Sequence, residues 1–102
     1  MKIIYATWGY QNICIDVTSF LQEKITNEEL FIKMDHSFFP SNPCTFIKEL
    51  KISYEYKGVI RNLIVQEQHG SNKRALIIKS GKHDTVNNIG THGKGLLEIS
   101  VL

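Results

Sequence analysis

Arginine is scarce in this sequence, and long apolar runs are missing. Only two of the twelve basic residues are arginines, Arg61 and Arg74, and the formal net charge is +2. Because arginine is the side chain best suited to reading bases and phosphates, so low a count argues against nucleic acid as a partner. No stretch approaches the roughly 20 apolar residues of a membrane-spanning helix, so we expect no membrane partner either.

Cysteine is also rare, with Cys14 and Cys44 as the two examples. The N-terminal apolar run ends at Gln11 and lacks a small-residue cleavage site, so we predict no signal peptide and a cytoplasmic protein. Thiols stay reduced in that compartment. We therefore expect two free cysteines, and a disulfide between them stays the alternative.

The chain has 102 residues, of which 42% are hydrophobic and 22% charged. These values are typical of one soluble globular domain with a modest core. Repeats, low-complexity segments and linkers are absent from the sequence. We therefore predict a single domain over residues 1–102.

The clearest pattern lies between Phe46 and Glu67. Apolar residues alternate with polar ones over its first half: Leu50, Ile52, Tyr54 and Tyr56 against Glu49, Lys51, Ser53 and Glu55. This period of two predicts a strand with one buried face. Gly58 tolerates a positive φ, so Lys57-Gly58 can form a tight turn into a second strand. The stretch therefore predicts a β-hairpin.

Turn signals divide the rest of the chain into short elements. We predict strands over residues 2–8, 13–17, 30–34, 75–79 and 96–102, a helix over 19–25, and long loops over 35–45 and 80–95. In the first strand, Ile4, Ala6 and Trp8 are expected on one face. Phe38, Phe39 and Phe46, in or beside the first loop, are expected to pack it against the body. About seven short strands favour an all-β fold, an antiparallel β-sandwich of immunoglobulin-like or similar type with one short helix.

Four motifs carry a resemblance to a known family. They are Ile-Tyr-Ala-Thr-Trp-Gly at 4–9, Asp-Val-Thr at 16–18, Phe-Phe-Pro at 38–40 and Lys-Glu-Leu-Lys-Ile-Ser-Tyr-Glu-Tyr-Lys-Gly at 48–58. In order and spacing they resemble a small domain of unknown function that ends a mitochondrial DnaJ-like co-chaperone. Similar domains occur alone or joined to other modules in microbial proteins. The hairpin motif is the most specific of the four.

This resemblance covers residues 3–67 and departs from the family at two places. Trp8 stands where tyrosine is usual, and Ser41-Asn42-Pro43 replaces an Asp-Pro. The resemblance implies a fold. It supplies no catalytic residues and does not imply a mitochondrial location.

No catalytic or metal-binding motif of a recognised kind is present, so we predict a protein that is not an enzyme and has no cofactor. The histidines His36, His69, His83 and His92 show no i, i+2 or i, i+4 pair that would align two ligands. We therefore predict no metal site. A site formed by His83, Asp84 and His92 in the second long loop is the alternative to solvated histidines.

Aromatic residues suggest one binding surface. Trp8 and Tyr10 flank a glycine in a predicted turn, and Gln11, Asn12 and Asn42 are polar residues of nearby loops. Exposed aromatics beside such amides suit stacking on a sugar ring. The competing interpretation, which we favour, is that Trp8 belongs to the core, because tryptophan is highly buried on average.

Strand edges suggest a second surface. The predicted last strand carries a single charge, and the first strand is similarly apolar on both faces. An apolar strand at an edge invites pairing with another copy, here through Leu97, Ile99 and Val101. We therefore expect a non-enzymatic structural or interaction module that forms a homo-oligomer or contacts another protein. The alternative is a carbohydrate-binding, lectin-like module that binds a glycan.

Overall fold

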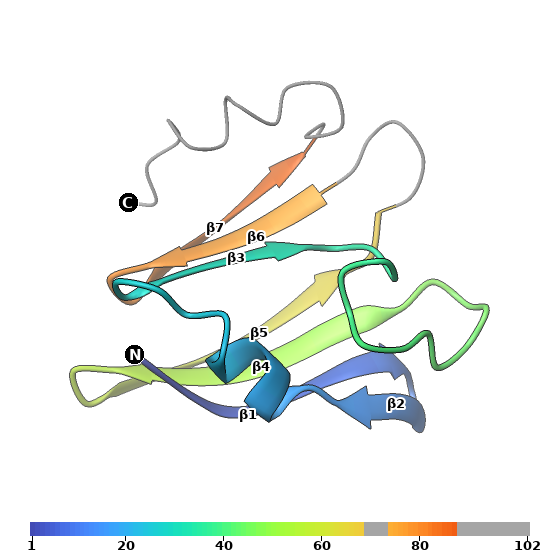
Figure 1. The fold of residues 1–102 in the computed structure, drawn as a ribbon, viewed down its shortest axis with the longest axis horizontal. Helices are drawn as coiled ribbons and strands as arrows, with labels where there is room; N and C mark the ends of the chain where they lie inside the picture. The colour runs from blue at the N-terminus through green and yellow to red at the C-terminus, as the bar shows by residue number, and fades with distance from the viewer. Residues whose placement is uncertain (69–73, 88–102) are drawn as a thin grey trace.

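The protein folds as two sheets packed face to face (Figure 1). The structure is a computed structural model that describes residues 1–68 and 74–87, and these ranges contain seven strands and one short helix. The elements are β1 Lys2–Tyr10, β2 Ile13–Asp16, α1 Thr18–Gln22, β3 Glu29–Lys33, β4 Glu49–Tyr56, β5 Val59–Gln66, β6 Arg74–Lys79 and β7 Lys82–Asn87. The larger sheet has the strand order β2-β1-β4-β5, and the smaller has the order β3-β6-β7. All these pairings are antiparallel, which confirms the predicted all-β sandwich with one short helix.

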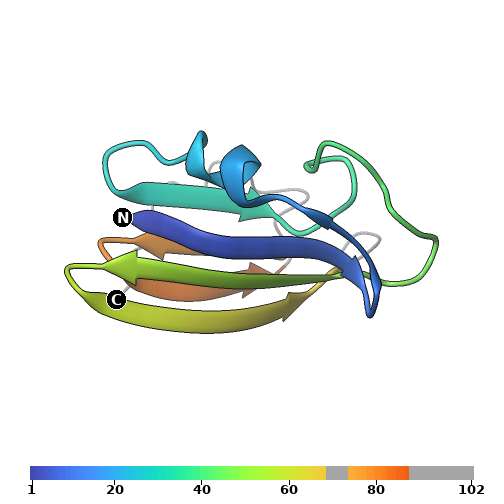
Figure 2. The same cartoon turned by 90° about the horizontal axis from the view of Figure 1, so that it is seen from below.

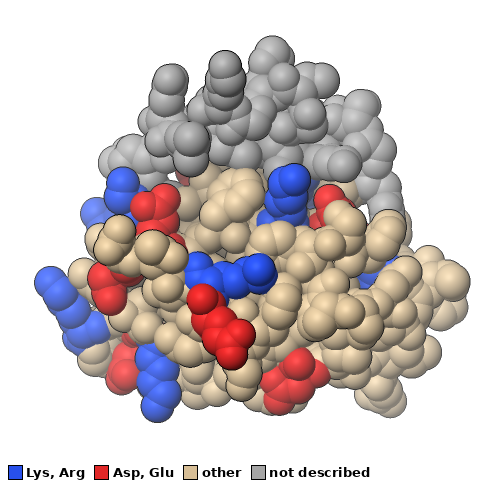
Figure 3. Space-filling model, in the orientation of Figure 1, with Lys and Arg blue, Asp and Glu red and all other residues tan. Residues whose placement is uncertain are grey.

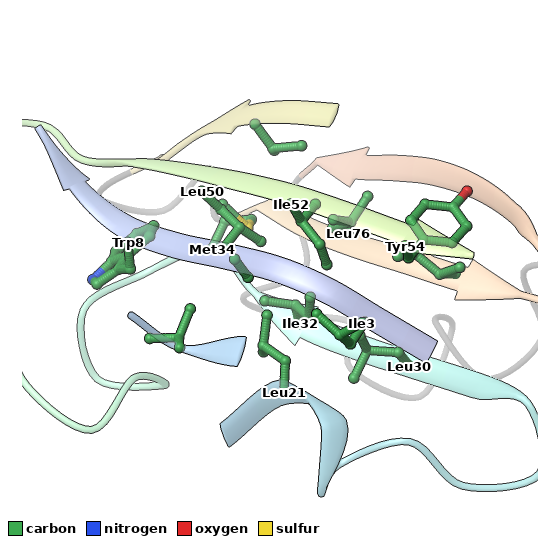
Figure 4. Close-up of a cluster of buried hydrophobic side chains, with 14 of the residues drawn as sticks. Ile3, Trp8, Leu21, Leu30, Ile32, Met34, Leu50, Ile52, Tyr54 and Leu76 are labelled. Atoms are coloured by element: carbon green, nitrogen blue, oxygen red, sulfur yellow. The ribbon is translucent and has the colours of Figure 1, made fainter. Parts of the chain in front are cut away.

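The core lies between the sheets because alternate residues of the central strands are apolar. In β4 these are Leu50, Ile52 and Tyr54, and they face the smaller sheet, where Leu76 and Ile78 of β6 are fully buried. Helix α1 adds one side chain, Leu21, which points toward β3 in Figure 4. The remaining buried apolar members of this cluster are Ile3, Ala6, Trp8, Val17, Leu30, Ile32, Met34, Phe39 and Val65.

The hairpin is confirmed in its register. β4 and β5 pair from Tyr56↔Val59 through Glu49↔Gln66, so that Lys57 and Gly58 form a two-residue turn. Both turn residues have a positive φ, 51° and 81°, as the tight turns that match the twist of paired strands require.

The first strand differs from the prediction because of a β-bulge. The pairing of β1 with β4 shifts between Ile3 and Tyr5, so Ile4 is an extra residue in the strand. The inward residues are therefore Ile3, Ala6 and Trp8, while Ile4 is 43% exposed. The expectation that Ile4 shares a face with Ala6 and Trp8 is wrong, since one inserted residue exchanges the faces on either side of it.

The side of the sandwich next to β1 is closed by irregular chain. Figure 2 looks onto the larger sheet, with α1 on one side and β5 on the other. The segment between β3 and β4 packs down at two of the three predicted residues, because Phe39 is buried in the core cluster and Phe38 packs against that cluster. The expectation for Phe46 is wrong, since this side chain is 55% exposed. Among the residues that the structure describes, β5 is thus the edge of the larger sheet away from this irregular chain.

Other boundaries depart from the sequence expectations. The helix ends at Gln22 rather than residue 25, and strand β7 occupies part of the predicted second loop. β7 was missed because its sequence, Lys-His-Asp-Thr-Val-Asn, contains one large apolar residue, as suits an exposed strand. β1 lies between β2 and β4, so it is no edge. The predicted strand over residues 96–102 lies outside the described residues.

Candidate interaction surfaces

Trp8 is a core residue. Its side chain is fully buried, and its ring is stacked on Phe39 with the ring centroids 4.0 Å apart and the planes at 16°. Trp8 faces inward because it pairs with Leu50 in the register of β1 and β4. A sugar ring has no access to this indole, so the prediction of Trp8 as a ligand-binding residue is wrong and the core interpretation is right.

The other residues of the predicted glycan site are accessible. Tyr10 is half-buried, and Gln11, Asn12 and Asn42 are exposed. Gln11 follows Tyr10 in the turn between β1 and β2, and its side-chain amide donates a long hydrogen bond of 3.5 Å to the Tyr10 hydroxyl. Asn42 belongs to the separate segment between β3 and β4. The structure thus brings together Tyr10, Gln11 and Asn12 at one turn.

Phe46 takes the place beside Tyr10 that sequence reasoning gave to Trp8. The two rings lie 5.0 Å apart between centroids, and Phe46 and the following Ile47 are 55% and 49% exposed. At the end of the molecule where the segment before β4 and the β1–β2 turn lie, Figure 3 shows few charged side chains. Elsewhere on the face drawn there, positive and negative side chains are mixed. We call Tyr10, Phe46 and Ile47 the end surface.

A buried ion pair holds the chain behind the end surface. The ammonium group of Lys48 donates to the carbonyl oxygens of Cys44 and Phe46, each at 3.0 Å, and lies 3.4 Å from Oε1 of Glu67. That carboxylate oxygen also accepts a hydrogen bond of 2.9 Å from the Lys48 backbone N–H. The ammonium group thus makes two hydrogen bonds to carbonyl oxygens and one ion pair with a carboxylate. The pair therefore fixes the backbone from which Phe46 and Ile47 project.

Tyr54 joins the two sheets at the opposite end of β4. Its hydroxyl donates to the carbonyl oxygen of Gly81 at 3.0 Å and lies 3.1 Å from Nδ1 of His83. Burial raises the pKa of the Tyr54 hydroxyl, and the positive charge of Arg61 opposes this rise. The contact links β4 to the turn between β6 and β7.

The described residues contain no group of three His, Cys, Asp or Glu side chains that could hold a metal ion. His83 and Asp84 are neighbours in β7, so their side chains point to opposite faces, and His92 lies outside the described residues. Cys14 and Cys44 are both free.

Four strands form sheet edges in the described part of the chain, and they differ in protection. β2 has four residues, and β3 begins with Glu29 and ends with Lys33. β7 carries Lys82, His83 and Asp84. β5 has eight residues with a single charge, Arg61, and exposes three large apolar side chains: Val59 at 52%, Ile60 at 58% and Ile64 at 65%. β5 is therefore the least protected of these edges.

Sequence reasoning did not identify this edge. It placed β5 in a hairpin, but the neighbours of a strand on its other side depend on the whole sheet order. The residues it named for self-association, Leu97, Ile99 and Val101, lie outside the described residues.

Comparison with known protein families, curated proteins and solved structures found no match for this chain. No helix within residues 1–68 and 74–87 is long and apolar enough to cross a membrane.

Proposed function

We propose that this protein is a non-enzymatic interaction module that associates with itself through the edge strand β5. The observation that carries the proposal is the exposure of Val59, Ile60 and Ile64 on a strand whose partner in the described part of the chain is β4 alone. Natural sheets protect such edges with charges, bulges, prolines or short strands. β5 has none of these beyond Arg61, so an uncovered edge of this kind is suited to a partner.

The energetic argument concerns apolar area. Burying an exposed isoleucine side chain contributes about 1.5–3 kcal/mol, and Ile60 and Ile64 both lie on the outer face of the same strand. An added strand would also give hydrogen-bond partners to the backbone groups of β5 that face away from β4. Because one strand edge buries little area, we expect a weak, concentration-dependent oligomer.

Light scattering coupled to size-exclusion chromatography tests this function. The proposal predicts a mass that rises from one chain toward two between micromolar and millimolar concentration. Ile64→Lys places a charge on the edge and should keep the protein monomeric. Ile47→Lys is the matched control, since Ile47 is similarly exposed but lies off β5, and it should behave as the parent protein. A parent protein that stays monomeric throughout would overturn the proposal.

A second candidate function is glycan binding at the end surface, favoured by the contact between Tyr10 and Phe46. Both rings are accessible, and Gln11 and Asn12 supply amides in the adjoining turn. A glycan array tests it with the Tyr10→Ala variant. Hits that Tyr10→Ala abolishes would support carbohydrate binding, while an empty array, or hits that Tyr10→Ala leaves unchanged, would count against it.

The resemblance to the domain of the DnaJ-like co-chaperone supports the non-enzymatic part of the proposal. That resemblance supplies no catalytic residue to any position of this chain.

A further inference from the structure

The backbone of β5 offers hydrogen-bonding groups at alternate residues. In an antiparallel pair these groups point by turns toward the partner strand and away from it. A two-residue turn begins its hairpin with a hydrogen-bonded pair, here Tyr56 and Val59. Counting from that pair, the odd-numbered residues of β5 turn their N–H and C=O groups toward β4. The groups at the outer edge therefore belong to Ile60, Asn62, Ile64 and Gln66. The Gln66 carbonyl oxygen accepts a hydrogen bond of 3.1 Å from Nη1 of Arg74, so the edge groups offered to a second copy are those of Ile60, Asn62 and Ile64.

These edge groups limit how a second copy can pair with β5. When two copies of β5 pair antiparallel, the outward-facing groups of one copy must meet those of the other, so each even-numbered residue lies opposite another even-numbered residue. The two-fold axis is then at a residue position, where one residue lies opposite the same residue of the second copy. An axis at Arg61 places two positive charges opposite each other, which is destabilising. An axis at Leu63 places Asn62 against Ile64 and Ile60 against Gln66, which mixes amides with isoleucines.

An axis at Ile64 pairs only residues 62–66 and uses Gln66, whose carbonyl oxygen is already bonded to Arg74. An axis at Asn62 matches the side chains best. Ile60 then faces Ile64 of the partner subunit, and Asn62 faces Asn62 of the partner subunit. Arg61 faces Leu63 of the partner subunit, so the two arginines are not directly opposed. Seven residues of each strand, 59–65, lie opposite one another in this arrangement.

We infer that two copies pair antiparallel through β5 with Asn62 on the two-fold axis, and that their two larger sheets become one continuous sheet of eight strands. This inference rests on the proposed self-association and adds its register. The outer face of this sheet then carries one isoleucine pair on each side of the Asn62 pair. The Asn62 side chain already accepts a hydrogen bond from the Ser53 hydroxyl, which leaves its two amide N–H donors for the partner subunit's Asn62.

Single cysteines test this register in a Cys14→Ser/Cys44→Ser background. Directly opposed residues of a hydrogen-bonded pair have Cα atoms about 5.5 Å apart, within the range that a disulfide bridges. Asn62→Cys should therefore form a disulfide dimer on mild oxidation. Ile64→Cys alone should not, because each copy faces residue 60, four residues along the strand. A mixture of Ile60→Cys and Ile64→Cys proteins of different tag lengths should give the mixed dimer.

The outcomes separate the register from the association itself. The opposed thiols should oxidise at least about tenfold faster than those of Ile64→Cys alone, since pairing gives them a high effective concentration. A dimer in light scattering whose Ile64→Cys variant cross-links with itself, while Asn62→Cys does not, would overturn the register and leave self-association standing. A monomer in light scattering would remove both.

Discussion

The indole of Trp8 lies flat against the phenyl ring of Phe39, 4.0 Å away between centroids. This contact fastens the segment between β3 and β4 to the larger sheet. Truncating a buried phenylalanine costs about 3–5 kcal/mol, so we expect Phe39→Ala to lower the free energy of unfolding by that amount. Urea unfolding followed by Trp8 fluorescence measures it. Phe46→Ala, at an exposed position, is the control and should cost less than about 1 kcal/mol; equal losses would contradict the role of Phe39.

The buried pair of Lys48 and Glu67 gives a second prediction. Removing one partner of a buried ion pair costs about 3–5 kcal/mol, because the remaining charge stays buried and loses that attraction. Lys48→Met should therefore lower the free energy of unfolding strongly. The double variant Lys48→Met/Glu67→Leu should lose less than the sum of the two single variants. Strictly additive losses would show that the two side chains do not act as a pair.

Gly58 and Gly81 have similar backbone angles but different surroundings, so substituting both separates the cost of backbone strain from that of steric crowding. Gly58 and Gly81 have φ of 81° and 80°, so alanine is strained at both, at a cost of about 1–2 kcal/mol. A Cβ at Gly58 would meet open space, while one at Gly81 would lie 2.5 Å from the Tyr56 ring. We predict that Gly81→Ala costs about 1–3 kcal/mol more than Gly58→Ala, measured by urea unfolding. Equal costs would mean that Tyr56 moves aside freely.

The raised pKa of the Tyr54 hydroxyl predicts that the folded state loses stability at alkaline pH. Burial raises the pKa of its hydroxyl above the ordinary value of 10.0, so the folded state holds this proton more tightly than the unfolded state. Its contribution is complete below pH 10 and is lost as the pH rises through the folded pKa. Tyr54→Phe should cost about 1 kcal/mol at neutral pH through the lost hydrogen bond, and its stability should fall less steeply in alkali. An unchanged alkaline slope would assign the effect to other groups.

The turn and the paired strands of the hairpin could be predicted because the residues that determine them are close in sequence, although its first strand begins at Glu49 rather than at Phe46. The alternation in β4 and the Lys57-Gly58 turn set both the strand faces and the register. The faces of β1 could not be predicted, since the bulge at Ile4 arises from pairing with a strand more than forty residues away. β7 contains one large apolar residue, so its sequence has no alternation of apolar and polar residues that would predict a strand.

The candidate sites likewise depend on contacts between residues that are far apart in the sequence. The burial of Trp8 follows from its place in β1 and from Phe39, which comes from a distant segment. The exposure of Phe46 depends on Lys48 and Glu67, whose pairing no sequence spacing reveals. The edge position of β5 depends on the sheet order, which is a property of the whole fold.

Hydrogen exchange of the β5 backbone tests the central claim most directly. If β5 pairs with a second copy, the amides of Ile60, Asn62 and Ile64 gain hydrogen-bond partners, whereas those of Arg61 and Leu63 already face β4. Exchange measured by NMR at micromolar and millimolar concentration should therefore slow with concentration at residues 60, 62 and 64 and stay constant at 61 and 63. Exchange at residues 60, 62 and 64 that is fast and independent of concentration would contradict the account.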